Sequence, residues 1–223
     1  MCSSDLSEKA IESNQASSVK RIGRLATVAL YDELELSPKP GLVTLIDNGS
    51  HDDMNAQTFM RSLLSLRSYF SDIAQLGSQN APFELLQRSG IRAEATMLAA
   101  TGGINTHRGA IFMLGLLCAS AGSVYAKLNA QPNVKDIRDT LLEVWGHALR
   151  ERTMIPSKLP GGIAAKQYGL RSATQEAADG FPAVFELAYP ALKKALQRGL
   201  PWHLARLDTL FHVMAKLDRS EEH

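Results

Sequence analysis

Apolar residues recur along most of the chain at three- and four-residue steps, the spacing that places them on one face of a helix. In the stretch 17–36 this stripe consists of Ile22, Leu25, Ala29, Leu30 and Leu34. The stretch 55–76 has the same spacing, with Phe59, Leu63, Leu66, Phe70 and Ile73. No stretch alternates apolar and polar residues between turn residues, as half-buried strands do. The pattern therefore predicts helices and no sheet.

The stretch 107–127 differs because it is apolar around nearly its whole circumference. Such a helix is typical of the centre of a domain. Further helices are predicted at 82–88, 91–100, 134–150, 175–197 and 201–217, and Gly90 is expected to separate the first two. We therefore expect an all-α fold, with one multi-helix domain at 17–223 around a central apolar helix. Residues 1–16 are expected to be a flexible N-terminal segment.

The composition of the chain limits the classes of partner that it can bind. The 24 Lys and Arg residues nearly balance the 23 Asp and Glu residues, so no overall field attracts nucleic acid or an anionic membrane. The first ten residues lack the basic start and apolar core of a signal peptide, and Gly115 interrupts an apolar run too short to span a bilayer. Two cysteines cannot form a disulfide framework. We expect a cytoplasmic protein without nucleic-acid or membrane partners, whose anion binding is local.

A first polar segment, Pro38-Lys39-Pro40-Gly41, follows Glu33 and ends the first helix. Two prolines and a glycine are a sound helix terminator, which is one interpretation. The other is functional: the prolines fix the direction of Lys39, and a compact ammonium group suits phosphate.

His51 and Asp53 lie two residues apart in the loop that follows. This spacing allows both side chains to face one site, where they would serve acid–base chemistry or hold a metal ion. The structural alternative is that Asp53 caps the next helix.

A second polar segment, preceded by Glu94, joins two predicted helices and consists of Thr101, Gly102, Gly103, Ile104, Asn105, Thr106, His107 and Arg108. Its glycines allow close backbone approach, and Asn105 or Thr106 is expected to cap the next helix. That helix cap explains most of the segment without a ligand. It does not explain His107 and Arg108 in the first turn, where cations oppose the helix dipole. With the free amides of the helix start, they indicate a site for an anion.

These segments resemble the triphosphoribosyl-dephospho-CoA synthase family. The similar stretches are Glu33 with SPKPGLV, NGSHDDM, Glu94 with Met97, TGGINTHRGAIFMLGLLCASAG, YGLRSATQEAADGFP and LDTLFHVMAKLD. The resemblance extends from about 25 to 218 and implies an all-α fold. It also implies a reaction that joins ATP to 3'-dephospho-CoA and releases adenine. The product is the prosthetic-group precursor of citrate lyase or malonate decarboxylase.

The implied reaction is a substitution at the anomeric carbon of ribose, through a transition state that resembles an oxocarbenium ion. It requires a carboxylate near the ring, for which Glu33 or Glu94 is expected, and a proton acceptor, for which His107 or His51 is expected. Asp53 is the expected ligand of Mg²⁺. The triphosphate is expected to contact Lys39, Gly41, Thr101, Gly102, Gly103, Asn105, Thr106 and Arg108. The Lys39 turn, His51, Asp53, Glu94 and the loop from Thr101 to Arg108 are predicted to converge on one cleft.

The sequence departs from the family at three places. Thr44 stands where the family usually has an acid, and Ser172 to Ala177 replace Gly-Ala-Arg-Gly-Glu-Ala, with Arg171 nearby. Family members also continue beyond the last helix, through Asp-Thr-Asn and Arg-Gly-Gly. We therefore expect a C-terminally truncated member with an open site, and exposed apolar residues near Leu210, Phe211 and Met214 through which the chain self-associates.

Two alternatives to the synthase remain. One is a non-catalytic relative that binds a nucleotide or a partner protein. The other is an all-α nucleotide pyrophosphohydrolase, which is disfavoured because no predicted helix carries the repeated acidic spacing of a multi-metal site.

Overall fold

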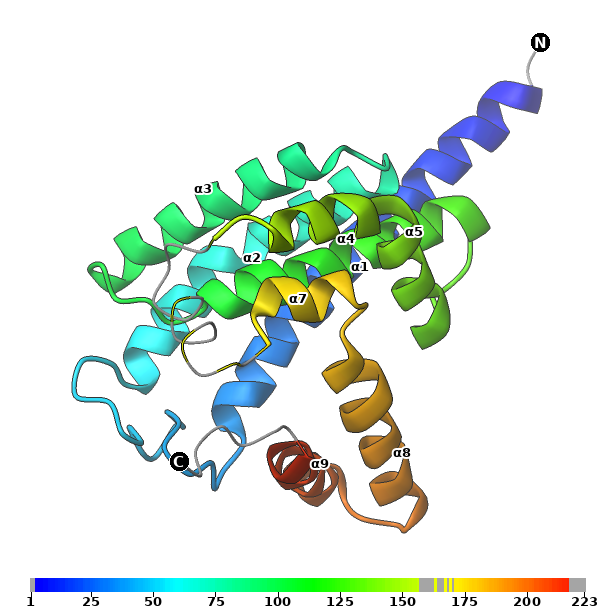
Figure 1. Ribbon diagram of the computed structural model, residues 1–223. Coiled ribbons are helices and arrows are strands. Elements are labelled where there is room, and N and C mark those ends of the chain that lie inside the picture. The colour runs from blue at the N-terminus through cyan, green and yellow to red at the C-terminus, as the bar shows by residue number, and fades with distance from the viewer. Residues whose placement is uncertain (1–2, 157–162, 164–166, 168, 170, 217–223) are drawn as a thin grey trace. The chain divides into compact units, whose positions relative to one another are not determined.

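The computed structural model describes residues 3–156, 163, 167, 169 and 171–216 (Figure 1). Within these ranges the chain forms helices joined by turns and no strand, so the predicted all-α fold is confirmed. The chain divides into two compact units: Met1–Glu35 with Lys39–Thr140, called unit 1, and Leu36–Pro38 with Leu141–His223, called unit 2. The single domain expected over 17–223 stays a prediction.

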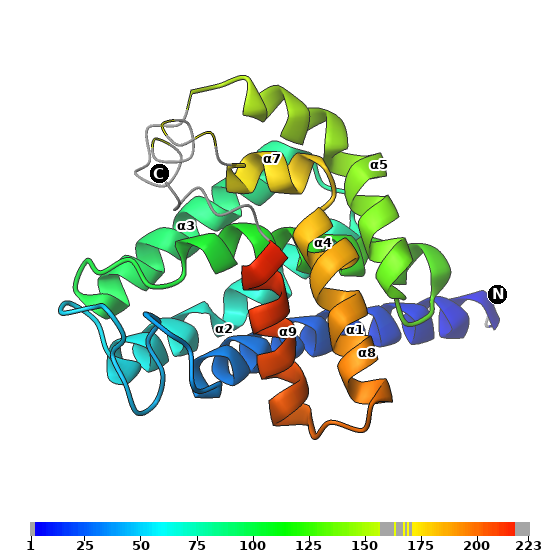
Figure 2. The ribbon, with the colours of Figure 1, turned by 60° about the horizontal axis from the view of Figure 1, so that its bottom comes forward.

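Unit 1 contains α1 (Ser3–Glu35), α2 (Ala56–Ser78), α3 (Phe83–Thr101) and α4 (Arg108–Leu128). Successive helices run in opposite directions (Figures 1 and 2). The α2 helix contacts each of the other three, and α4 also contacts α1 and α3. The core includes Leu34, Leu66, Phe70 and Met97, all fully buried.

The α2 and α4 helices approach closely at small residues. A Cβ atom added to Gly77 would lie 2.0 Å from the Ala119 carbonyl oxygen, and one added to Gly122 would lie 2.1 Å from that of Ala74. Neither distance leaves room for a side chain. The predicted central helix is therefore confirmed as a core element, and its glycines set its separation from α2.

The α4 helix has the length and apolar composition of a membrane span, which is found nowhere else in the described part of the chain. Half of its most apolar window is buried within the protein. Core helices of soluble proteins share these properties, so the observation is weak evidence for a membrane.

Two helix boundaries differ from the sequence-based prediction. The α1 helix begins at Ser3, although residues 1–16 were expected to be flexible. That stretch has helix-favouring residues but no apolar stripe, so periodicity does not reveal it. The predicted break at Gly90 is wrong, because α3 continues through it. A glycine costs a helix interior only about 1 kcal/mol, and the buried face formed by Leu86, Ala93 and Met97 lies on both sides of it.

Unit 2 contains most of α5 (Val134–Thr153), followed by α7 (Ala173–Ala178), the π-helix η1 (Ala183–Ala188), α8 (Tyr189–Gln197) and α9 (Trp202–Lys216). The last three contact one another. In the stretch 175–197, Gly180 and Phe181 separate α7 from η1, and Pro190 lies in the first turn of α8. In α9, Phe211 and Met214 are exposed, as expected, and self-association stays a prediction.

Candidate functional site

Both polar segments singled out in the sequence lie at the same end of unit 1 (Figures 1 and 2). The antiparallel order of the helices explains this, because the α1–α2 and α3–α4 connections then leave the helices at one end. The first turns of α2 link the two segments. The Phe59 ring lies 5.0 Å from the His107 ring, edge to face, and Ser62 hydrogen-bonds to the same imidazole.

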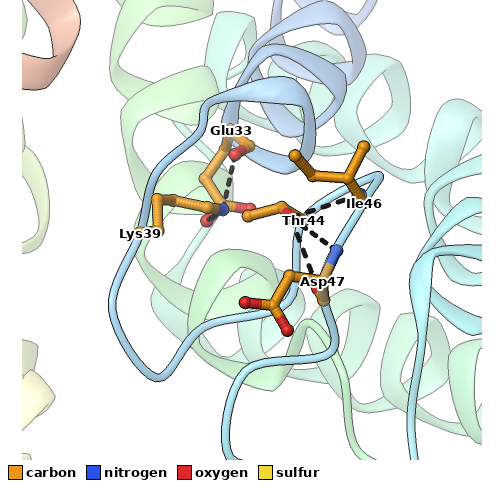
Figure 3. A network of polar contacts seen from close by, with 5 residues as sticks. All are labelled: Glu33, Lys39, Thr44, Ile46 and Asp47. Carbon is orange, nitrogen blue, oxygen red and sulfur yellow. Dashed lines mark hydrogen bonds and ion pairs between the residues drawn. The ribbon is translucent and has the colours of Figure 1, made fainter.

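In the α1–α2 connection, Lys39 turns back to the end of α1 (Figure 3). Its ammonium group forms an ion pair with the Glu33 carboxylate and donates a hydrogen bond to the Glu33 carbonyl oxygen at 2.6 Å. The Lys39 side chain is 2% exposed and that of Glu33 is 50% exposed. Lysine commonly satisfies carbonyls at a helix C-terminus in this way. The Pro-Lys-Pro-Gly turn therefore ends the helix and buries a cation beside a half-exposed carboxylate.

The loop after Lys39 folds back on itself. The Ser50 N–H donates to the Gly41 carbonyl at 3.2 Å, and a Cβ atom on Gly49, whose φ is +62°, would lie 2.5 Å from the Gly41 carbonyl carbon. Thr44 is buried, and its hydroxyl accepts the N–H of Asp47 at 3.0 Å and that of Ile46 at 3.3 Å (Figure 3). Thr44 thus closes a turn at the position where the resemblance led us to expect an acid.

His51 and Asp53 lie beside each other farther along this loop. The His51 Nδ1 atom lies 3.9 Å from Asp53 Oδ1, and the two side chains are 38% and 64% exposed. The alternative that Asp53 caps α2 is wrong, because Asn55 does so: its Oδ1 accepts the Thr58 N–H at 3.0 Å. Capping therefore does not account for the Asp53 carboxylate.

The α3–α4 connection is a tight turn with open space beside it. Gly102, with a φ of +69°, ends α3, and the Gly103 N–H donates to the Leu98 carbonyl at 2.7 Å. A Cβ atom added to Gly102 or Gly103 would meet nothing within 4 Å. The Thr101 hydroxyl donates inward to the Ile104 carbonyl at 2.6 Å. Asn105 Oδ1 accepts the Arg108 N–H at 3.2 Å, but the N-cap residue of α4 is His107, so the cap predicted at Asn105 or Thr106 lies one or two residues too early.

Arg108 has a partner within the protein. Its Nε donates to Glu94 Oε1 at 2.7 Å, and both side chains are 29% exposed. The carboxylate offsets the cation at the start of α4, so an external anion is not needed to explain Arg108 there. Each carboxylate predicted to act in catalysis is therefore paired with a cation predicted to bind phosphate: Glu33 with Lys39, and Glu94 with Arg108.

His107 immediately precedes α4 and is 5% exposed. Its Nδ1 atom lies 2.6 Å from Ser62 Oγ, and the Thr106 hydroxyl donates to the same Ser62 oxygen at 2.7 Å. Burial lowers the pKa of His107 to about 4, so the imidazole is neutral at pH 7. Its Nε2 atom is buried and has no hydrogen-bond partner among the described residues.

Ser62 is the residue of this site that sequence analysis missed. It is fully buried on α2, one residue before Leu63 of the apolar stripe, where a small polar residue attracts no notice. It lies 45 positions from His107 in the chain. Nothing in a single sequence relates two positions so far apart.

The predicted residues thus form three local groups at one end of unit 1: the Glu33–Lys39 pair, the His51–Asp53 pair, and the α3–α4 turn with Glu94, to which the structure adds Ser62. A single cleft shared by all three stays a prediction. A shallow hollow of about 480 Å³ lies elsewhere, against the end of α2 and the first half of α3, and is lined by Leu76, Leu85, Arg88, Ile91 and Arg92.

For a metal ion, the described residues offer no cluster of three or more His, Cys, Asp or Glu side chains. A fully protein-ligated ion therefore does not fit this part of the chain. Mg²⁺ usually takes one or two carboxylates and completes its shell with substrate phosphates and water. The exposed carboxylate of Asp53 suits an ion of that kind.

In unit 2, Arg171 lies near the position where the resemblance led us to expect an arginine. It forms ion pairs with Asp179 and, at 3.4 Å, with Glu176. Ser172 and Gln175 form a capping box at the start of α7. Arg171 therefore has carboxylate partners of its own around α7.

Comparison with known proteins bears on the whole chain. Proteins named probable 2-(5''-triphosphoribosyl)-3'-dephosphocoenzyme-A synthase are similar to it. The one from Pseudomonas fluorescens is 40% identical over 93% of this chain and 71% of its own length. Those from Acinetobacter calcoaceticus and Streptococcus equi subsp. zooepidemicus are each 36% identical, over 88% and 87% of this chain and 67% and 72% of their own lengths. No solved structure matches.

Residues 19–218 match the family described as ATP:dephospho-CoA triphosphoribosyl transferase. This range holds both polar connections and every side chain of the three local groups. The chain therefore belongs to the ATP:dephospho-CoA triphosphoribosyl transferase family.

Proposed function

We propose that this protein transfers the 5-triphosphoribosyl group of ATP to the 2'-hydroxyl of 3'-dephospho-CoA and releases adenine. The observation that carries the proposal is its family membership over residues 19–218. We further propose that the product is the prosthetic-group precursor of citrate lyase or malonate decarboxylase, and that the protein acts in the cytoplasm.

Two ion pairs at one end of unit 1 suit the charge of this reaction. The substrate combines a triphosphate, which needs cations, with a ribose that becomes positive as adenine leaves, which needs a carboxylate. Glu33 beside Lys39 and Glu94 beside Arg108 each supply both charges within one contact. We propose that Arg108 and the open Gly102–Gly103 turn hold the triphosphate. Glu94, partly shielded from water, then faces the ribose.

In the proposed reaction the 2'-oxygen of dephospho-CoA bonds to the anomeric carbon as the bond from that carbon to adenine N9 breaks. The bonding pair goes to adenine, and the hydroxyl proton is passed to a base and finally to adenine. His51 suits proton transfer better than His107, because the His51 side chain reaches solvent beside Asp53. Burial keeps the pKa of His107 near 4, which makes it a weak base at pH 7.

Asp53 is proposed to hold Mg²⁺ that arrives with the triphosphate. When bound, the ion would neutralise phosphate charge. Asp53→Asn should then reduce the affinity for ATP in the presence of Mg²⁺ and leave the affinity in EDTA unchanged. Equal weakening in both conditions would contradict this role.

The proposal is tested by incubating purified protein with ATP and dephospho-CoA and following adenine by chromatography and the joined product by mass spectrometry. We expect adenine and product in equal amounts, and no adenine without dephospho-CoA. Release of pyrophosphate with AMP would favour a pyrophosphohydrolase instead. ATP binding without adenine release would favour a non-catalytic relative.

A further inference from the structure

Two hydroxyl groups and the buried imidazole of His107 form a chain of hydrogen bonds. None of the roles proposed above accounts for this chain. Thr106 Oγ1 lies 2.7 Å from Ser62 Oγ, which lies 2.6 Å from His107 Nδ1. Both are ordinary distances for O–H···O and O–H···N hydrogen bonds. All three side chains come together where α4 begins against the second turn of α2.

The direction of these bonds decides where the imidazole carries its proton. The Thr106 hydroxyl donates to Ser62 Oγ. The Ser62 hydroxyl hydrogen is then free to be donated to His107 Nδ1, and a nitrogen that accepts it is unprotonated. A neutral imidazole protonated on only one nitrogen must then carry its hydrogen on Nε2.

We propose that Ser62 is a positioning residue that holds His107 in the tautomer protonated on Nε2, so that Nε2–H donates a hydrogen bond to the bound nucleotide. This inference rests on the proposed function for the identity of the nucleotide. The Nε2 atom is buried without a partner among the described residues. A buried donor without an acceptor destabilises the protein, and a ligand atom that accepts its hydrogen would remove that cost.

The chemistry of the proposed reaction makes the adenine ring the acceptor to expect. A neutral N–H group does not lose its proton at pH 7, yet it stabilises charge that develops on an acceptor. In the proposed reaction, negative charge develops on adenine as its bond to ribose breaks. A hydrogen bond from His107 to a ring nitrogen of adenine strengthens during that step, so its loss lowers kcat more than it raises KM.

The first test is spectroscopic and needs no turnover. In ¹⁵N-histidine-labelled protein, the ring nitrogens of His107, assigned with His107→Gln, should show a proton on Nε2 and none on Nδ1 between pH 6 and pH 8. Ser62→Ala should produce a mixture of tautomers. A proton on Nδ1 in the unmodified protein, or two protons at pH 7, would overturn the proposal.

The second test is kinetic and has a matched control on the same helix. Ser65→Ala removes a hydroxyl one turn along the same helix, where it donates a hydrogen bond to the Ser62 carbonyl at 2.7 Å. Ser62→Ala should lower kcat for adenine release roughly 10-fold or more, as loss of an orienting partner does elsewhere, with a smaller change in KM. Ser65→Ala should leave both constants unchanged. Equal effects of the two variants would mean that Ser62 is only structural.

Thr106 provides an independent variant if Ser62→Ala fails to fold, because its side chain is only half-buried. Thr106→Val removes the hydroxyl and should shift the tautomer, whereas Thr106→Ser keeps it and should restore the spectrum of the unmodified protein. Failure of Thr106→Ser to restore it would contradict the proposed chain. If the unmodified protein releases no adenine, the proposed function fails, but the tautomer still decides the role of Ser62.

Discussion

Two guanidinium nitrogens of Arg108 contact a single carboxylate oxygen of Glu94: Nε and Nη2 each lie 2.7 Å from Oε1. A guanidinium group engaged in this way is held in a fixed direction, which suits it to meet a second anion. The contact joins the last half of α3 to the first residue of α4 across the Gly102–Gly103 turn. The ion pair between Arg108 and Glu94 therefore helps to hold the shape of this turn.

We predict that Arg108→Ala weakens ATP binding more than it disturbs folding. Charged hydrogen bonds contribute about 1.5–3 kcal/mol each, so the Kd for ATP measured by calorimetry should rise at least about 10-fold. Arg88→Ala is the control, since Arg88 is an exposed arginine on α3 at the shallow hollow. Equal effects of the two variants on ATP affinity would show that Arg108 does not contact the bound ATP.

The buried ammonium of Lys39 depends on Glu33. Glu33→Ala leaves Lys39 with the Glu33 backbone carbonyl alone, and should lower the free energy of unfolding by about 1–3 kcal/mol in urea denaturation. Adding Lys39→Met should recover part of this loss, because it removes the unpaired charge. Asp139→Ala, which breaks the exposed pair with Lys135, should change little. A Glu33→Ala protein as stable as the Asp139→Ala protein would refute this prediction.

Stability should depend on pH through His107. Burial places its pKa near 4 in the folded protein, below the ordinary value of 6.5. Above pH 6.5 the imidazole is neutral in both states and full stability is present. As pH falls from 6.5 to 4, the unfolded chain takes up a proton that the folded protein does not, and the free energy of unfolding should fall by about 3 kcal/mol. His107→Gln should remove this part of the pH dependence, as measured by denaturation at several pH values. An unchanged slope would show that His107 is not buried in solution.

Because α2 and α4 lie close together, replacing a glycine at their contact should cost more stability than replacing a helical glycine elsewhere. Gly122→Ala would place a methyl group 2.1 Å from the Ala74 carbonyl oxygen, so the helices must separate. We expect a loss of about 1–3 kcal/mol in thermal or urea unfolding. Gly90→Ala on α3 would meet only ordinary contacts, at 3.6 and 3.8 Å. It should be neutral or stabilise the protein by up to about 1 kcal/mol. A tolerated Gly122→Ala would mean that the helices are farther apart.

The sequence by itself determined the helical class of this protein, its apolar core helix and the polar segments that separate its helices. Periodicity reports which face of a helix is buried, and Gly-, Pro- and Asn-rich turns report where helices end, because both depend on neighbouring residues. The Gly102 turn at the end of α3 was predictable for this reason. The same local rules failed at Gly90, where packing on both sides kept α3 continuous.

Only the tertiary structure decided which side chains meet. Ser62 and His107 lie 45 positions apart, and Glu94 and Arg108 lie 14 apart on different helices. The antiparallel packing of α2, α3 and α4 brings each pair within 3 Å, because it sets the ends of these helices side by side. Burial follows from the same packing, and it makes His107 a neutral imidazole, whereas its position in a polar, glycine-rich turn indicated a cation.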